Sequence, residues 1–177
     1  MSDKKELRRL VRAGIAQMDS CEKEKRSMAI CEEVEKYLAE SAARVIALFS
    51  PLGDEPLIWP LVEQMSKSLS VVLPRVEGDI MNFYTYDKEA MSVGAFGINE
   101  PRTGVSVSPC DIDVIIVPGV AFTACGARMG RGKGFYDKYL SQDGFSALKI
   151  GVCFCEQIVD YIPVEQHDVA MDVVIYK

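Results

Sequence analysis

The sequence predicts a single α/β domain, with a largely parallel sheet and helices on both of its faces. Short β-rich apolar runs alternate with amphipathic helical segments, and the run at Asp113–Val117 is uniformly apolar after its first residue, which is typical of a strand buried on both faces. The 177 residues, 49% of them hydrophobic, suffice for one substantial core but not for two full domains. Since no repeat or linker divides the chain, one domain is expected over residues 1–177.

Two amphipathic helices are predicted at the start of the chain. One apolar stripe runs from Leu7 to Met18 and a second from Ile30 to Leu38, with Lys and Glu at the intervening positions. Asp19-Ser20 separates the two stripes and can cap the second helix. The chain therefore opens with a helical pair.

A strand and a turn follow, at Arg44–Phe49 and Ser50–Gly53, and Pro56 suits the first turn of a helix over residues 57–65. Residues 69–73 are predicted as a strand that Pro74 closes, and residues 81–86 as another strand. The Gly, Pro, Ser and Asn content of residues 90–109 predicts mostly loop.

The second half of the chain continues the alternation. The strand at residues 113–117 leads through Pro118-Gly119 and a glycine loop to a helix near Phe135, and further strands are predicted at residues 148–154 and 173–176. Ligands of such sheets bind at the carboxyl ends of the strands. Ser50–Glu55 and Pro118–Gly134 both follow strand ends, so the two loops are expected to border one cleft.

The strongest chemical signal is the glycine-rich loop at residues 128–137, which reads Arg-Met-Gly-Arg-Gly-Lys-Gly-Phe-Tyr-Asp. Three glycines alternate with Arg131 and Lys133, and a helix-compatible segment follows. Residues without Cβ let backbone N–H groups approach an anion, while a helix start and two cationic side chains add positive charge. The loop is therefore predicted to bind phosphate.

Two common nucleotide-binding motifs do not fit this loop. A Walker A loop needs GxxxxGK followed by Ser or Thr, but Ala127 stands at the first glycine position and Gly134 follows Lys133. A dinucleotide fingerprint needs GxGxxG, and Phe135 stands at its third glycine. A P-loop nucleoside triphosphatase and a nicotinamide enzyme are both disfavoured. The structural alternative is a wide turn with solvated basic residues.

Several charged residues have both a structural and a functional interpretation. Asp137 either favours a helix start or binds magnesium beside phosphate groups. Asp172, on the sequence alone, is a strand-start residue. The basic cluster near the N-terminus places Lys4, Arg8 and Arg12, or Lys5, Arg9 and Arg12, on one face of the first predicted helix, and this face is either solvated or functional.

Composition and charge disfavour several classes of protein. A net charge of −6 argues against a nucleic-acid binder that relies on broad attraction, and a small anionic ligand fits the local clusters of cations better. The first residues lack the apolar core of a signal peptide, and no apolar run approaches membrane-spanning length. Six cysteines without a CxxC pair and a single histidine disfavour structural zinc. We expect a cytoplasmic monomer with no nucleic-acid or membrane partner.

Motifs spread in order over almost the whole chain resemble those of one family. They are Lys4–Arg8, Glu55, Pro74-Arg75, Gly97–Pro101, Val117–Phe122, Arg128–Asp137, Glu156-Gln157, Val164 and Met171-Asp172. Together they resemble the 5-formyltetrahydrofolate cyclo-ligases, also called 5,10-methenyltetrahydrofolate synthetases. The arginine-glycine-lysine-glycine segment is highly specific.

The resemblance implies an ATP- and magnesium-dependent ligase of one-carbon metabolism that converts a reduced folate, 5-formyltetrahydrofolate, to 5,10-methenyltetrahydrofolate. In that family the formyl oxygen attacks the γ-phosphate of ATP. The folate N10 then attacks the phosphorylated intermediate, and loss of phosphate leaves the methenyl ring. Such a reaction depends on positioning and charge neutralisation and needs no covalent enzyme nucleophile.

The resemblance also implies roles for individual residues. The residues expected to bind ATP are Lys4, Lys5, Arg8, Arg128, Gly130, Arg131, Gly132, Lys133, Gly134, Phe135 and Tyr136. Those expected to contact the folate are Ser50, Glu55, Arg131, Gly132, Lys133, Gly134 and Phe135. The expected catalytic residues are Arg131, Lys133 and Tyr136, and the expected magnesium ligands are Asp137 and Asp172.

Two other functions compete with this interpretation. The glycine loop alone is compatible with a sugar-phosphate isomerase or an acyl-transfer enzyme on a similar sheet, which would bind a sugar phosphate without ATP. A non-catalytic module that binds nucleotide or RNA phosphate through the loop is the second, and the acidic net charge counts against it.

Overall fold

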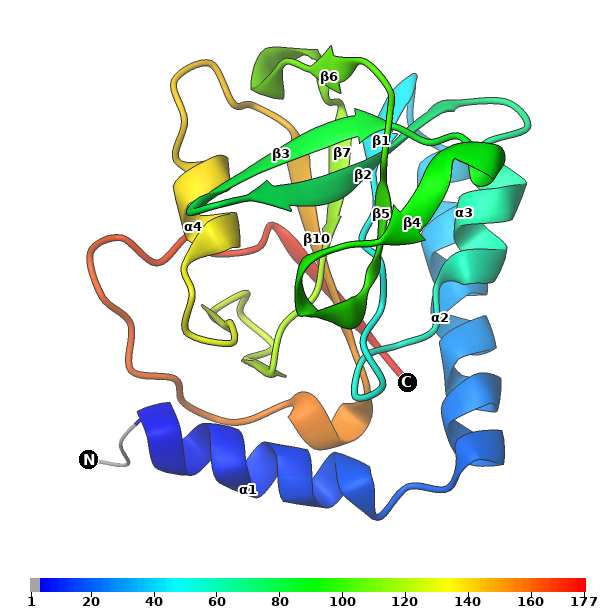
Figure 1. Ribbon diagram of the computed structural model, residues 1–177. Helices are drawn as coiled ribbons and strands as arrows, with labels where there is room; N and C mark the ends of the chain where they lie inside the picture. The colour runs from blue at the N-terminus through cyan, green and yellow to red at the C-terminus, as the bar shows by residue number, and fades with distance from the viewer. Residues whose placement is uncertain (1–3) are drawn as a thin grey trace.

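The apolar runs of the chain pair into one seven-stranded sheet, in the order β11-β10-β7-β1-β2-β3-β6, in a computed structural model that describes residues 4–177 (Figure 1). The strands from β11 to β2 are parallel, whereas β3 and β6 pair antiparallel. Their bounds are β1 Val45–Ala47, β2 Ser70–Glu77, β3 Ile80–Thr85, β6 Ser106–Val107, β7 Val114–Val117, β10 Leu148–Cys153 and β11 Val173–Tyr176. The predicted α/β class and the largely parallel sheet are confirmed.

Successive side chains of the central strands point to opposite faces of the sheet and into two hydrophobic clusters. Ile46 and Ile116 belong to one cluster, and their neighbours Ala47 and Ile115 belong to the other. The first cluster also takes in the apolar sides of α1 (Lys4–Ala16), α2 (Ser20–Ala39) and α3 (Trp59–Met65), and the second takes in α4 (Phe135–Leu140). Helices therefore cover both faces, as the sequence predicts.

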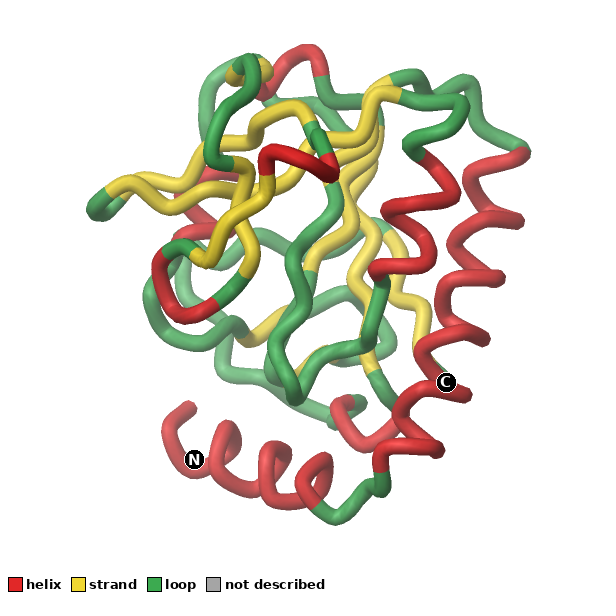
Figure 2. The backbone as a smooth tube through the Cα atoms, turned by 45° about the vertical axis from the view of Figure 1, so that its right-hand side comes forward, coloured by secondary structure: helices red, strands yellow, loops and turns green. Residues whose placement is uncertain are grey.

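The two opening helices form where the apolar stripes predict them. Val11 and Ile15 are the buried residues of α1, and α2 begins at Ser20 after the Asp19 side chain, which accepts a hydrogen bond from the Glu22 N–H at 2.8 Å. Figures 1 and 2 show α1 lying across one end of the sheet rather than along a face. This placement leaves the charged side of its first turns available to the loops at that end.

Two local predictions about proline are wrong. The helix α3 begins at Trp59 with Pro60 in its first turn, so Pro56 lies in the preceding loop. Pro74 does not close β2, which continues to Glu77. Since β1 pairs with β2 only as far as Val72, no parallel neighbour requires a hydrogen bond from position 74.

The segment at residues 90–109 contains more regular structure than the predicted loop. The strands β4 (Met91–Val93) and β5 (Asn99–Pro101) form an antiparallel hairpin, and β6 adds to the edge of the main sheet. A second small hairpin, β8 (Ala121–Phe122) with β9 (Arg128–Met129), leads into the glycine loop. Short 3-10 turns complete the fold: η1 Lys88–Ala90, η2 Ala95–Gly97, η3 Pro109–Asp111 and η4 Cys155–Gln157. Among residues 4–177, no helix has both the length and the apolar character that a membrane span requires.

Candidate functional site

The glycine loop leaves β9 and turns into α4 through backbone conformations that favour glycine. Gly132 has a φ of 96° and Gly134, which caps the start of α4, has a φ of 70°. At Gly130 a Cβ atom would lie 3.0 Å from the Arg128 guanidinium, so a side chain there would crowd it. The alternation of glycine with Arg131 and Lys133 therefore has a backbone reason as well as a chemical one.

This loop forms one wall of a cavity of about 880 Å³. The loop after β1 and the loop after β7 both line it, which confirms the predicted shared cleft at the carboxyl ends of the strands. The glycine loop contributes every residue from Arg128 to Lys138. Polar residues from the two ends of the chain complete the rim: Lys4, Arg8, Glu165, His167 and Asp168.

The first turns of α1 touch the glycine loop directly. The Arg8 Nε donates a hydrogen bond to the Gly130 carbonyl at 2.8 Å. The Lys4 Nζ lies 2.8 Å from Asp168 Oδ2 and 3.0 Å from Glu165 Oε2. Burial of the Lys4 ammonium opposes its charge, but these two hydrogen bonds outweigh that effect and raise its pKa. The structure thus brings Arg8 to the predicted phosphate loop, and Lys4 lines the same cavity beside the segment at 165–168.

Arg128 and Asp137 form an ion pair at the base of the glycine loop. The Arg128 Nη2 donates to Asp137 Oδ2 at 2.9 Å, and its Nη1 donates to the Pro118 carbonyl at 3.3 Å. The Arg128 side chain is only 3% exposed, and its Nε is a buried nitrogen without a hydrogen-bond partner among the described residues. The Val169 N–H donates to the other Asp137 oxygen at 3.3 Å, which places the segment at 165–168 beside Asp137.

Arg131 links the glycine loop to the loop that follows β1. Its Nε and Nη2 donate to Glu55 Oε1 at 3.1 and 2.8 Å, and its outer nitrogens donate to Asp54. Glu55 is 8% exposed, and burial raises the pKa of its carboxyl although Arg131 opposes the shift. Burial also acts to raise the pKa of Asp54, but the hydrogen bonds and the positive charge of Arg131 outweigh burial there and lower this pKa.

The other half of the cavity is mostly apolar. The Ser50 hydroxyl is buried in its wall and donates to the Asn99 carbonyl at 2.5 Å. Phe96, at the tip of the β4–β5 hairpin, lies with its ring centroid 6.1 Å from that of Phe135 in the glycine loop. The remaining apolar wall residues include Phe49, Leu52, Pro74, Val76, Met81 and Ile98. Such a pocket, with a few fixed polar groups, suits a flat and largely apolar ring system.

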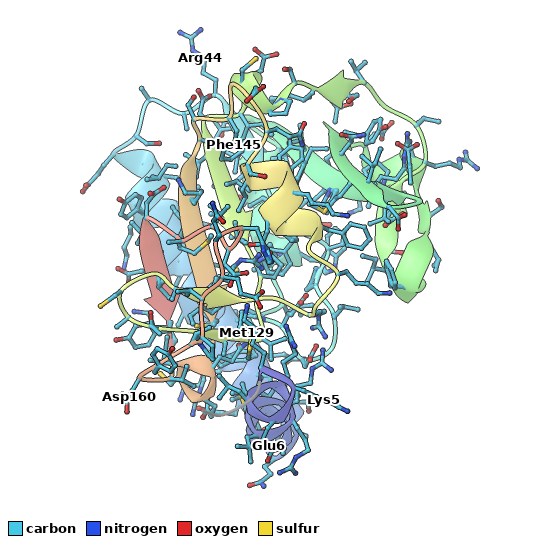
Figure 3. All side chains as sticks on the ribbon, turned by 90° about the vertical axis from the view of Figure 1, so that its left-hand side faces the viewer. Lys5, Glu6, Arg44, Met129, Phe145 and Asp160 are labelled. Carbon is cyan, nitrogen blue, oxygen red and sulfur yellow. The ribbon has the colours of Figure 1, made fainter. Side chains whose placement is uncertain are left out.

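Most of the predicted site residues line the cavity. Lys133 and Tyr136 are both in its wall, Lys133 exposed and Tyr136 partly covered. Burial and the nearby Glu55 charge raise the pKa of Tyr136, so its phenol stays protonated. Lys5 projects from α1 and is exposed, outside the set of lining residues (Figure 3).

The structure does not bring Asp172 to Asp137. The Asp172 carboxylate accepts the Lys149 N–H at 2.8 Å and pairs with the Lys149 ammonium at 2.8 Å, where β10 and β11 begin. This is the strand-start position that the sequence alone indicates. Asp168 lines the cavity instead, with Glu165 and His167, and the ligand atoms of these three lie within 4.8 Å of one another.

Sequence reasoning missed Asp54, Glu165 and Asp168. Asp54 directly precedes Glu55, which was predicted, so this proximity was the available signal. Glu165 and Asp168 lie in a loop without periodicity, and their role depends on where the chain end folds.

Comparisons with known proteins give one consistent result. The model of the 5-formyltetrahydrofolate cyclo-ligase family matches residues 1–177. A 5-formyltetrahydrofolate cyclo-ligase of Mycolicibacterium smegmatis is 32% identical over 139 residues, which cover 73% of this chain and 72% of the relative.

Solved structures agree with the match in sequence. The NMR structure of the 5,10-methenyltetrahydrofolate synthetase of Aquifex aeolicus superimposes with a TM-score of 0.88 at 33% identity, over 98% of this chain and 89% of the other. The Mycoplasma pneumoniae 5,10-methenyltetrahydrofolate synthetase superimposes with a TM-score of 0.81 at 26% identity, over 98% of both chains.

Proposed function

Because the chain belongs to the 5-formyltetrahydrofolate cyclo-ligase family of enzymes, we propose that it closes 5-formyltetrahydrofolate to 5,10-methenyltetrahydrofolate with ATP and Mg²⁺ in the cavity at the carboxyl edge of the sheet. The observation that carries the ATP part is the contact between the N-terminal helix and the glycine loop, where Arg8 donates to the Gly130 carbonyl at 2.8 Å. Cations from distant parts of the sequence thereby surround one cavity.

The chain's own residues fit a triphosphate. Lys4, Arg8, Arg128, Arg131 and Lys133 all line the cavity and supply positive charge from two directions. The buried Arg128 Nε has no hydrogen-bond partner among the described residues, which is uncommon for a buried donor. The glycines of the loop leave its backbone accessible to an anion.

The carboxylates fit a magnesium ion bound with that triphosphate. Mg²⁺ in phosphate-transfer sites is usually held by one or two carboxylates together with phosphate oxygens. Asp137 and Asp168 line the same cavity, and the Val169 N–H that follows Asp168 donates to Asp137 at 3.3 Å. Asp137 with Asp168 is therefore the carboxylate pair that we propose, in place of Asp137 with Asp172. Lys4 now neutralises Asp168 and would exchange that contact for phosphate.

The folate would occupy the apolar half of the cavity, between the loop after β1 and the β4–β5 hairpin. Ser50 and Glu55 fix the polar part of that wall, and Phe135 contributes an aromatic face. Arg131 and Lys133 belong to the glycine loop, which pairs with Glu55 in this wall and accepts a hydrogen bond from Arg8 of the nucleotide half. The formyl group would therefore meet the phosphates beside these two residues.

The chemistry asked of these residues is positioning and charge stabilisation. Phosphorylation of the formyl oxygen by ATP, with Mg²⁺ on the phosphates, turns that oxygen into a leaving group. Arg131 and Lys133 would stabilise negative charge that develops there, and the protonated Tyr136 phenol provides a hydrogen-bond donor. Enclosing the folate fixes N10 beside the activated carbon, which makes ring closure an intramolecular step. No side chain has to form a covalent bond.

The test is formation of methenyltetrahydrofolate by the purified protein, followed by its absorbance. We expect the signal with 5-formyltetrahydrofolate, ATP and Mg²⁺ together, and none when ATP or the metal is omitted. Turnover without ATP would reject the nucleotide part of the proposal. No turnover with any nucleotide or divalent metal would reject the activity.

A further inference from the structure

Asp54 lies between two arginines behind the cavity wall. Its carboxylate accepts hydrogen bonds from the outer nitrogens of Arg131, one of them at 3.2 Å, and its Oδ2 lies 3.6 Å from the Arg12 Nε. Arg131 and Glu55 line the cavity, whereas Asp54 and Arg12 do not. Any effect of Asp54 on a ligand in the cavity would therefore pass through Arg131.

Two carboxylates occupy both hydrogen-bonding edges of the Arg131 guanidinium. The Nε and Nη2 atoms donate to Glu55, and the Nη1 and Nη2 atoms donate to Asp54. A guanidinium binds a phosphoryl group most strongly through two parallel N–H donors on one edge. For Arg131 to bind phosphate in this way, one of the two carboxylates has to leave.

Asp54 is the carboxylate that is easier to release. Glu55 is 8% exposed and its second oxygen accepts the Leu52 N–H at 2.9 Å, so it is held by its own loop and would be left buried without a cation. The Asp54 side chain is 30% exposed, and Arg12 is a second cation already beside it. Water and Arg12 can therefore stabilise its charge once Arg131 has moved.

We propose that Asp54 is a positioning residue that holds Arg131 against the loop after β1 while no nucleotide is bound, and passes to Arg12 when a triphosphate takes Arg131. The inference rests on the proposed function, because it needs a triphosphate in this cavity. Asp54 then competes with phosphate for one guanidinium. Arg12 favours nucleotide binding by drawing Asp54 away, although it lies outside the cavity wall.

The competition gives two variants with effects of opposite sign. Asp54→Asn keeps the size of the side chain but removes the charge that holds Arg131, so the affinity for nucleotide is expected to rise by up to about fivefold, the range of a partly exposed ion pair. Arg12→Gln leaves Asp54 with Arg131 alone, so the affinity is expected to fall by a similar factor. A general loss of structure would weaken binding in both variants.

The experiment is calorimetric titration of the full chain with a non-hydrolysable ATP analogue and Mg²⁺. The control is Glu63→Gln, which removes an exposed carboxylate that is paired with Lys88 at 2.8 Å and is not among the residues lining the cavity. The double variant Asp54→Asn with Arg12→Gln distinguishes an effect of Arg12 that passes through Asp54 from a direct electrostatic effect of Arg12 on the nucleotide. If Arg12 acts through Asp54, its replacement has no further effect in the Asp54→Asn background.

Tighter binding by Asp54→Asn, weaker binding by Arg12→Gln and no added effect in the double variant support the proposal. Equal or weaker binding by a folded Asp54→Asn, checked by its thermal unfolding, overturns it. An Arg12→Gln effect that persists in the double variant overturns the exchange with Arg12. A wild-type chain that binds no analogue contradicts the proposed function instead, so the two failures are distinguishable.

Discussion

The two edges of the parallel sheet use carboxylates in different ways. At the carboxyl edge, Glu55 and Asp137 pair with the side chains of Arg131 and Arg128 in the cavity wall. At the amino edge, Asp113 accepts the N–H groups of Arg44 and Val45 at 2.8 and 2.9 Å, where β1 begins. Figure 3 shows Arg44 at one end of the molecule and Lys5 and Met129 toward the other.

The position of an acidic residue relative to the strands therefore decides which groups it binds. An amino-edge carboxylate replaces hydrogen-bond acceptors that a strand lacks at its start, and Asp172 does the same for Lys149. A carboxyl-edge carboxylate lies where parallel strands open into loops, and meets the cations of a ligand site. Replacing residues at the carboxyl edge should therefore affect catalysis, and replacing residues at the amino edge should affect stability.

The largest effect is expected at the carboxyl edge from Lys133→Ala. Lys133 is exposed in the glycine loop, so its removal takes away charge in the cavity but little packing. Loss of one electrostatic group at a reacting phosphoryl is expected to lower kcat by about 10²–10³-fold. The measurement is the methenyl-forming rate at saturating ATP. Lys67→Ala, outside the cavity wall, is the matched control, and equal rates for both variants would refute the role of Lys133.

The next largest effect is expected in a titration with Mg²⁺, which compares carboxylates at the two edges of the sheet. Asp137→Asn and Asp168→Asn are expected to raise the half-saturating Mg²⁺ concentration by about tenfold or more, because each removes a charged oxygen from the cavity. Asp172→Asn should leave that concentration unchanged, since its partner is Lys149 at the other edge.

The titration has an outcome that reverses the comparison. A shift for Asp172→Asn with none for Asp168→Asn would restore Asp172 as the second metal ligand. Because Asp137 also pairs with the buried Arg128, the unfolding transition of Asp137→Asn is measured alongside, so that a loss of fold is not taken for a loss of metal.

At the amino edge we expect a smaller effect, on stability alone. Asp113→Ala removes the acceptor of two backbone N–H groups and should lower the free energy of unfolding by about 1 kcal/mol. The Michaelis constants for ATP and folate should not change. Urea unfolding checks this against Asp143→Ala, an exposed acidic residue in a turn. A large rise in either Michaelis constant would contradict the division between the edges.

The smallest effect is the pH dependence of the same Asp113→Ala difference. Backbone hydrogen bonds from Val45 and Arg44 lower the pKa of Asp113, so its stabilising contribution is complete above the unfolded pKa of about 3.9 and is lost as the pH falls through the folded value. The difference in unfolding free energy between wild type and Asp113→Ala should therefore shrink in acid. A constant difference down to the lowest accessible pH would show that the carboxylate charge is not involved.

The fold was largely predictable because its helices and buried strands have strong periodic patterns. The stripes from Leu7 to Met18 and from Ile30 to Leu38 marked α1 and α2, and the apolar run at Val114–Val117 marked a central strand. Pro74 was wrongly predicted to end its strand. A proline, which has no N–H to donate, is tolerated at a strand position from which the neighbouring strand takes no hydrogen bond, and β1 pairs with β2 only as far as Val72. That condition depends on where β1 ends, which is tertiary information.

The candidate site was predictable where its residues lie in one segment, and less so where they come together from distant segments. The glycine loop carried a local chemical signal of its own. The placement of Lys4 beside Asp168, and of Asp54 between Arg12 and Arg131, depends on how α1 crosses the end of the sheet. The predicted monomeric state and cytoplasmic location stay predictions.

We propose above all that α1 and the glycine loop bind one nucleotide between them. Amide hydrogen exchange of the full chain, measured with and without ATP and Mg²⁺, tests it most directly. The nucleotide should slow exchange both in the first turns of α1, around Lys4 and Arg8, and in residues 130–134. Slower exchange in only one of these two segments would contradict it.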